Sequence, residues 1–142
     1  MPQERYKKTA GGVSNLNYHF VWCVKYRKPM LTDAVEVRLK ELLLEKCAAL
    51  GVTVAQLEVR PDHVHLFITA PPTDAPQHYA NQFKGYTSRI LRQEFPHLKS
   101  RLPALWSRSY YVGAAGTVTA AVIQRYIEAQ NTRSAVLPKG RE

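Results

Sequence analysis

Apolar side chains change their spacing several times along the chain, and each change predicts a different kind of element. Residues 17–26 (NYHFVWCVKY) are aromatic and β-branched and contain no glycine or proline, which predicts a β-strand. Residues 52–60 and 63–70 have the same character on either side of a Pro-Asp pair, so they predict two strands joined in a hairpin. Residues 104–112 (ALWSRSYYV) predict a fourth strand.

Between these segments apolar residues recur every three or four positions, which predicts helices. The first predicted helix begins near Asp33 and ends at Gly51, and a second spans about residues 77–95. The apolar stripe of the first consists of Leu39, Leu42, Leu43, Cys47 and Leu50. The buried stripe of the second consists of Ala80, Phe83, Ile90 and Leu91. A last helix is predicted over about residues 117–131.

The resulting order, β-α-β-β-α-β with a further C-terminal helix, is the split-βαβ pattern of ferredoxin-like folds. We therefore expect an α+β domain with an antiparallel sheet. Both main helices should lie on one face of that sheet, because crossover connections are right-handed. The opposite face then needs a cover or a ligand. Residues 1–142 are predicted to form a single domain, with a folded core over residues 13–131 and basic tails at both ends.

The composition favours a polyanionic partner. There are 20 Lys and Arg against 11 Asp and Glu, a net charge of +9 and a pI near 9.8, and such basic globular proteins often bind nucleic acid. Solubility alone is the other explanation of this charge.

The composition also excludes some classes of protein. An apolar content of 45% argues against disorder, and no apolar run approaches the roughly 20 residues of a membrane helix. Cys23 and Cys47 lack metal-binding or redox spacing and are expected to be reduced thiols of a cytosolic protein.

Two histidines in the strand predicted over 63–70 are the first candidate site. In a strand, alternate residues share a face, so His63 and His65 point to one side while Val64 and Leu66 point to the helix-covered core. Two imidazoles on an open face could bind one divalent ion. The alternative is two ordinary histidines on a half-exposed strand, because a His-x-His spacing alone is a weak motif.

The predicted C-terminal helix supplies a second candidate pair. Tyr126 and Gln130 are four residues apart and therefore lie on one face of the helix. The glutamine oxygen suits magnesium or manganese better than zinc. The tyrosine phenol is a candidate nucleophile, although a free phenol with a pKa of about 10 is weak near neutral pH. The alternative is a tyrosine that packs the helix beside a surface glutamine.

The helix predicted over 77–95 carries a basic stripe opposite its apolar side. Lys84, Ser88 and Arg92 are spaced four residues apart, and Arg89 lies beside them. The stripe is either a phosphate-binding surface or an ordinary solvated face, and the sequence does not favour one over the other.

Five stretches of the chain, read together, resemble a known family. They are NLNYHFVWCVKYRKPML, RPDHVHLFITAPP, FKGYTSRILRQEFP, LWSRSYYVG and VIQRYIEAQ, and they extend from residue 15 to residue 130. In this order they are similar to the single-tyrosine HUH transposases of bacterial and archaeal insertion sequences, the insertion-sequence 200/605 group and its repeat-associated relatives. The resemblance implies a ferredoxin-like fold whose last helix carries a catalytic tyrosine.

The resemblance also implies a role for each residue of the two candidate pairs. His63 and His65 would be metal ligands, Gln130 a third ligand, and Tyr126 the catalytic nucleophile. The implied cofactor is Mg²⁺ or Mn²⁺. The implied activity is cleavage and rejoining of single-stranded DNA at insertion-sequence ends through a 5′-phosphotyrosine intermediate.

The partners that the resemblance implies are hairpin-bearing single-stranded DNA and a second copy of the chain, in the bacterial or archaeal cytoplasm near the nucleoid. Sites would be shared between the subunits of a homodimer, and Gly113 and Gly116 could allow the last helix to change sides. Family motifs do not fix the hairpin-binding residues. Lys84, Arg89 and Arg92 are therefore DNA-binding candidates on charge alone.

Three alternatives remain at the level of the sequence. A host-domesticated relative would nick repetitive hairpins without moving itself. A non-enzymatic module would bind single-stranded nucleic acid on the same ferredoxin-like sheet, usually with base-stacking aromatics where this chain has histidines. A metal-dependent hydrolase of small phosphoesters fits poorly, because the chain is strongly basic and has no conspicuous cluster of acidic ligands.

Overall fold

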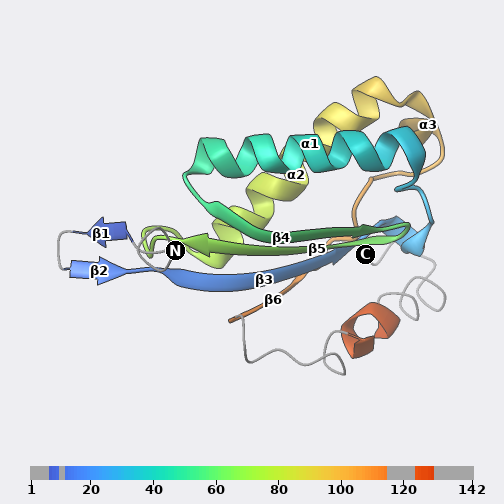
Figure 1. Ribbon diagram of the computed structural model, residues 1–142. Coiled ribbons are helices and arrows are strands. Elements are labelled where there is room, and N and C mark those ends of the chain that lie inside the picture. The colour runs from blue at the N-terminus through green and yellow to red at the C-terminus, as the bar shows by residue number, and fades with distance from the viewer. Residues whose placement is uncertain (1–6, 10–11, 115–123, 130–142) are drawn as a thin grey trace.

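The computed structural model describes residues 7–9, 12–114 and 124–129. A four-stranded antiparallel sheet carries two long helices on one face (Figure 1). Its strands, in chain order, are β3 (Leu16–Cys23), β4 (Thr53–Arg60), β5 (His63–Ala70) and β6 (Tyr111–Ala114). A separate two-stranded ribbon of β1 (Lys7–Thr9) and β2 (Gly12–Ser14) precedes β3, so β1 falls in the segment that the sequence assigns to the N-terminal tail.

The strands of the main sheet lie in the order β4-β5-β3-β6. β3 pairs antiparallel with both β5 and β6, and β4 pairs with β5 across the predicted turn at Pro61 and Asp62. The first and third strands of the sheet are therefore central, as in ferredoxin-like folds. The predicted α+β class and the antiparallel sheet are confirmed.

The sheet separates a large apolar core from a second, more polar face. Alternate side chains along a strand point to opposite sides, so β3 and β5 each contribute to both. The fully buried side chains on the helix side include Phe20, Trp22, Val64, Leu66 and Ile68. The residues between them face away from the helices, and His63 and His65 are among these.

Helices α1 (Asp33–Leu50) and α2 (Pro76–Glu94) cover the core face. α1 ends at Gly51, whose φ of 73° is the left-handed conformation that glycine adopts without strain. α1 buries Val35, Leu39, Leu42, Leu43 and Cys47, and α2 buries Tyr79, Ala80, Phe83, Thr87 and Leu91. The predicted stripes are thus confirmed except at Leu50 and Ile90, which are only partly buried against the core.

The first strand is shorter than the sequence predicts. β3 ends at Cys23, and a short 3₁₀ turn, η2 (Lys25–Arg27), follows it. Tyr26 and Arg27 have φ values of 60° and 51°, which a strand cannot accommodate. The turn brings Arg27 next to the hairpin between β4 and β5.

The fourth strand was expected over residues 104–112, and this expectation is wrong in its boundaries. Only Tyr111–Ala114 pairs with β3, so Gly113, one of the two glycines expected to let the last helix change sides, is a strand residue. Residues before it are held by other contacts: Trp106 forms an isolated bridge with Val24, and its indole Nε1 donates to the Thr87 hydroxyl at 3.1 Å. Anchoring to α2 and to the end of β3 replaces the ladder that the aromatic pattern suggested.

The described part of the last helix covers the face of the sheet opposite α1 and α2 (Figure 1). It comprises residues 124–129, while the rest of the predicted helix, Gly116 and the C-terminal tail lie outside the described residues. The sequence patterns do not predict the short helix α3 (Pro96–Ser100), which follows α2. Among the described residues no helix is long and apolar enough to cross a bilayer.

Candidate active site

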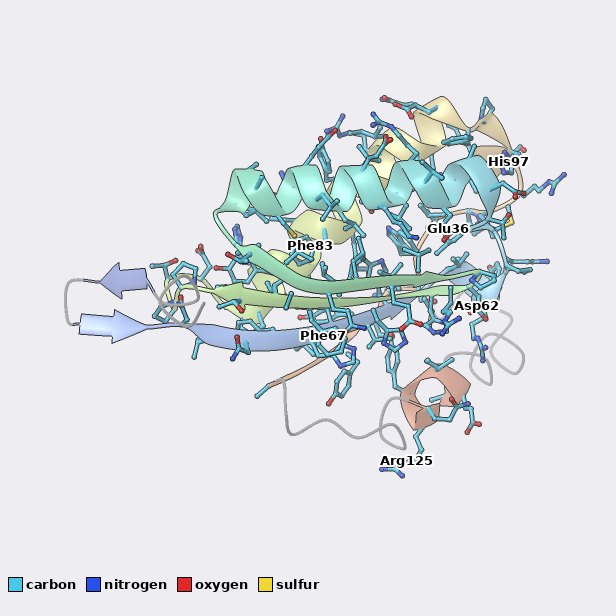
Figure 2. The ribbon with its side chains drawn as sticks, viewed as in Figure 1. Glu36, Asp62, Phe67, Phe83, His97 and Arg125 are labelled. Carbon is cyan, nitrogen blue, oxygen red and sulfur yellow. The ribbon has the colours of Figure 1, made fainter. Side chains whose placement is uncertain are left out.

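The face of β3 and β5 opposite α1 and α2 carries the imidazoles of the two central strands. Antiparallel pairing places Cys23 opposite His63, Val21 opposite His65, and His19 opposite Phe67. These six side chains share one face because each pair is two residues from the next along both strands. Figure 2 shows Phe67 and Asp62 on this side of the sheet, whereas Glu36 and Phe83 lie on the side of α1 and α2.

His63 is oriented by the Asp62 carboxylate, which Arg27 in turn binds. Its Nδ1 lies 2.7 Å from Asp62 Oδ1, and Arg27 Nε donates to Asp62 Oδ2 at 2.9 Å. Burial of the Asp62 carboxyl raises its pKa, but the hydrogen bonds and charges of His63 and Arg27 outweigh burial and hold that pKa below its usual value. The carboxylate is therefore ionised and can only accept, so Nδ1 of His63 donates and Nε2 is the nitrogen left to bind a cation.

His65 has a different neighbour, the buried His19. The His19 Nε2 and the His65 Nδ1 are 3.1 Å apart, and the His19 ring also stacks on Phe67 at a centroid distance of 3.8 Å. Burial and the neighbouring His65 lower the pKa of His19 to about 4. Burial, with the charge of His63 adding to it, also lowers the pKa of His65. Both rings are therefore neutral near pH 7, and a neutral imidazole is the form that binds metals.

The described residues supply two of the ligands that a divalent cation would need. His63 and His65 lie two residues apart on one face with their rings 5.0 Å apart between centroids, and both have Nδ1 engaged within the protein. Within the described residues there is no group of three His, Cys, Asp or Glu side chains arranged to hold a metal. A third ligand is therefore needed, and Gln130, the residue predicted for it, lies outside the described residues.

Tyr126 reaches this face on residues 124–129. Ile127 packs against Val21 and Cys23, and the Tyr126 ring lies 6.2 Å from the Tyr111 ring. Arg27 Nη1 also donates to the Ile127 carbonyl at 3.4 Å. In Figure 2 the Arg125 side chain of this helical segment points away from the sheet. The structure thus brings the segment that carries Tyr126 onto the histidine-bearing face of its own chain.

The predicted basic stripe on α2 divides into two kinds of side chain. Lys84 Nζ donates to the carbonyl oxygens of Ser107, Arg108 and Ser109 at 2.8, 3.1 and 3.1 Å. Burial lowers the pKa of Lys84 to about 8. Arg92 Nη2 likewise donates to the Leu102 carbonyl at 3.0 Å. These two cations fasten the loop after α3 to α2.

Arg89 is the exposed member of the stripe. Its guanidinium lies over the Tyr86 ring, 5.8 Å from the centroid. Arg89 also borders two surface hollows of about 240 and 270 Å³. One of the hollows is lined by Ser88, Arg89, Arg92, Gln93 and Lys99. Arg89 is thus the candidate DNA contact whose charge faces solvent.

Three residues that contact the site were not predicted to lie there: His19, Asp62 and Arg27. A signal for His19 existed, because its position in the predicted strand over 17–26 puts it on one face with Val21 and Cys23. Finding its contact with His65 also required the register between β3 and β5, which the sequence does not fix. Arg27 reaches Asp62 only through the left-handed turn at the end of β3.

The chain is similar to several known transposases. The sequence profile of the family described as IS200-like transposases matches residues 12–130. The ISDra2 transposase TnpA of Deinococcus radiodurans is 40% identical over 129 residues, which cover 89% of this chain and 92% of that protein. The transposase for insertion sequence element IS200 of Salmonella typhimurium is 31% identical over 118 residues, covering 82% of this chain and 77% of that protein.

Two solved structures share the fold. A crystal structure from Deinococcus radiodurans, assigned as a transposase, has a TM-score of 0.81 and 39% identity, and the similarity covers 87% of this chain and 97% of that one. A REP-associated tyrosine transposase bound to a REP hairpin has a TM-score of 0.53 at 13% identity, covering 80% of this chain and 62% of that one. The second likeness concerns the fold alone.

Proposed function

The chain belongs to the family of IS200-like transposases and is therefore a DNA-processing enzyme, and on that premise we propose that it cleaves and rejoins single-stranded DNA with Tyr126 as the nucleophile. One observation carries the proposal. Residues 124–129 lie on the sheet face that bears His63 and His65, so a phenol and two oriented imidazoles occupy the same side of the molecule.

His63, His65 and Gln130 would hold a divalent cation, Mg²⁺ or Mn²⁺. The cation, when bound, supplies Lewis-acid stabilisation of the negative charge that develops on phosphoryl oxygens. Asp62 leaves Nε2 of His63 as the nitrogen available to the cation, and the Nδ1 of His65 is in contact with His19. The amide oxygen of Gln130 is a hard donor and suits these two ions.

Cleavage begins when the phenolic oxygen of Tyr126, having lost its proton, attacks the scissile phosphorus. A bond forms between that oxygen and phosphorus while the bond from phosphorus to the 3′-oxygen breaks. The departing 3′-oxygen takes up a proton, which leaves a free 3′-hydroxyl and a DNA 5′-phosphate esterified to Tyr126. The phosphodiester is exchanged rather than hydrolysed, so its bond energy is retained.

Rejoining reverses these events with a different 3′ end. A 3′-hydroxyl of the recipient strand loses its proton and attacks the phosphotyrosine phosphorus. The bond between phosphorus and the tyrosine oxygen breaks, and Tyr126 recovers its proton. Neither ATP nor a water nucleophile is needed, because the phosphotyrosine ester retains the energy of the broken phosphodiester bond.

The proposed substrate is single-stranded DNA with hairpins at the ends of the element. A net charge of +9 favours a polyanion, and Arg89 presents an exposed guanidinium beside two hollows of the α2 surface. Lys84 and Arg92 would act at this surface mainly by fixing the loop beside α2, because backbone carbonyls already accept their protons. We further propose a homodimer in which each tyrosine serves the histidines of the other subunit.

The reaction is tested with labelled, hairpin-bearing single-stranded oligonucleotides in the presence of Mg²⁺ or Mn²⁺. A protein-linked DNA band on a denaturing gel is expected for the wild type and for Tyr111→Phe, the control at the neighbouring phenol. The band should vanish in Tyr126→Phe and when EDTA removes the ion. A band that persists in Tyr126→Phe would assign the nucleophile to another residue.

A further inference from the structure

His19 is a buried imidazole in contact with one candidate metal ligand, His65, and the reaction proposed above assigns it no step. Its exposed fraction is 2%. Its ring stacks on the Phe67 ring, and the Tyr111 ring lies edge-on to it with the two centroids 6.4 Å apart. Its Nε2 points at His65 Nδ1, 3.1 Å away. A buried polar ring with this contact has a defined hydrogen-bonding role.

The contact between the two rings requires one proton, and its position decides what His65 can do. A neutral imidazole carries a proton on one nitrogen and a lone pair on the other. If His19 Nε2 carries the shared proton, His65 Nδ1 is the acceptor and the remaining proton of His65 sits on Nε2. If His65 Nδ1 carries it, the Nε2 lone pair of His65 is free for a cation.

The tautomer of the neighbouring His63 indicates which of the two arrangements applies to His65. The Asp62 carboxylate can only accept, so it keeps the proton of His63 on Nδ1 and the lone pair on Nε2. His19 occupies the equivalent position behind His65, although it comes from β3 rather than from the hairpin turn. Two ligands of one ion need the same tautomer if both bind it through Nε2.

We propose that His19 is a positioning residue: it accepts the Nδ1 proton of His65 and thereby holds His65 in the tautomer whose Nε2 binds the cation. This role of His19 rests on the proposed function, which supplies the cation. The tautomer of His65 is a property of the metal-free chain and can be measured without ion or DNA.

The first experiment is nitrogen-15 NMR of the histidine rings in the metal-free protein at pH 7.5. We expect a protonated Nδ1 and an unprotonated Nε2 in His65, and the same in His63. In His19→Phe, which keeps an aromatic ring against Phe67 but removes the acceptor, His65 should shift toward the Nε2-protonated form. A wild-type His65 protonated on Nε2 overturns the proposal.

The second experiment measures Mn²⁺ affinity by calorimetry on variants that retain the wild-type circular dichroism spectrum. Loss of a group that orients a ligand typically weakens metal binding about 10–100-fold, and we expect a loss in this range for His19→Phe. His19→Gln returns an acceptor oxygen toward His65 and should restore affinity to within about threefold. His97→Gln, at an exposed histidine of α3, is the matched control and should bind as the wild type does.

The outcomes separate the two proposals. If His63→Ala and His65→Ala bind Mn²⁺ as tightly as the wild type, the metal site of the proposed function fails, and the NMR result alone then decides whether His19 sets the tautomer. If those two variants lose affinity but His19→Phe does not, His19 has no positioning role. Equal losses in His19→Phe and His19→Gln would overturn the proposal as well, because the acceptor would then be irrelevant.

Discussion

Basic side chains that look alike in the sequence are used in different ways by this protein. Lys84 and Arg89 lie on the same helix, five residues apart, yet Lys84 ends among three backbone carbonyls while Arg89 remains exposed. The difference arises because the loop after α3 passes over Lys84 and leaves Arg89 uncovered. A charge pattern can therefore identify a basic helix but not which of its cations remains available to phosphate.

Replacing Lys84 should lower stability. Lys84→Met keeps the length and apolar stem of the side chain but leaves the carbonyls of Ser107, Arg108 and Ser109 without this donor. We expect the free energy of unfolding, from urea denaturation, to fall by about 1–3 kcal/mol. Lys99→Met, at an exposed lysine of α3, is the control and should change it by less than about 0.5 kcal/mol.

Replacing Arg89 should weaken DNA binding without a comparable loss of stability. For Arg89→Gln we expect affinity for a hairpin oligonucleotide to fall for all sequences tested. The slope of log affinity against log salt should also become smaller by about one, because one phosphate contact is lost. Fluorescence anisotropy over a salt series measures both. An unchanged slope would remove Arg89 from the DNA-binding surface.

At the scale of elements, contacts from other parts of the chain decide where a strand begins and ends more than the β propensity of the segment itself does. The 104–112 stretch reads as a strand, yet the Trp106 indole, the Lys84 ammonium and the backbone of Cys23 hold most of it as a loop. Only its last two residues join β6. Side chains from distant elements override local β propensity here, and no local pattern reveals them.

Two helix glycines provide a matched test at this scale. Gly51 terminates α1 with a φ of 73°, whereas Gly85 is exposed within α2. A β-carbon at Gly85 would meet no atom within 4 Å other than its chain neighbours and the backbone of its own helix. Gly51→Ala should destabilise the protein by about 1–2 kcal/mol, because an alanine is strained in that conformation. Gly85→Ala should stabilise it by about 0.5–1 kcal/mol. Thermal and urea unfolding of the two variants would measure whether each substitution raises or lowers the free energy of unfolding.

At the scale of the whole molecule, the two faces of the sheet have separate tasks. One face packs α1 and α2 into the core, and the other carries the three imidazoles and residues 124–129. The period-two alternation of the strands made this division predictable, including the face on which His63 and His65 lie. The contact of Asp62 with His63 was not predictable in this way, because it depends on the conformation of the turn. The contact of His19 with His65 depends on the strand register. The position of Gln130 lies outside the described residues.

Shared sites in a dimer make a prediction about mixed subunits. In the single chain residues 124–129 lie on their own sheet, so each histidine pair could be served by its own tyrosine or, after exchange, by that of the partner. A heterodimer of Tyr126→Phe and His63→Ala subunits has one intact site under exchange and none otherwise. We expect the mixture to recover adduct formation that neither variant shows alone. No recovery, with heterodimers verified by mass spectrometry, would favour sites within one subunit.

In the proposed reaction Tyr126 becomes covalently joined to the 5′-phosphate of the cleaved strand. The most direct measurement is mass spectrometry of the adduct after proteolysis and nuclease trimming. We expect a nucleotide 5′-phosphate attached to the peptide that contains Tyr126, with the other strand product ending in a 3′-hydroxyl. A nucleotide found on Tyr110, Tyr111 or another side chain, or cleavage that leaves no linked peptide, would contradict it.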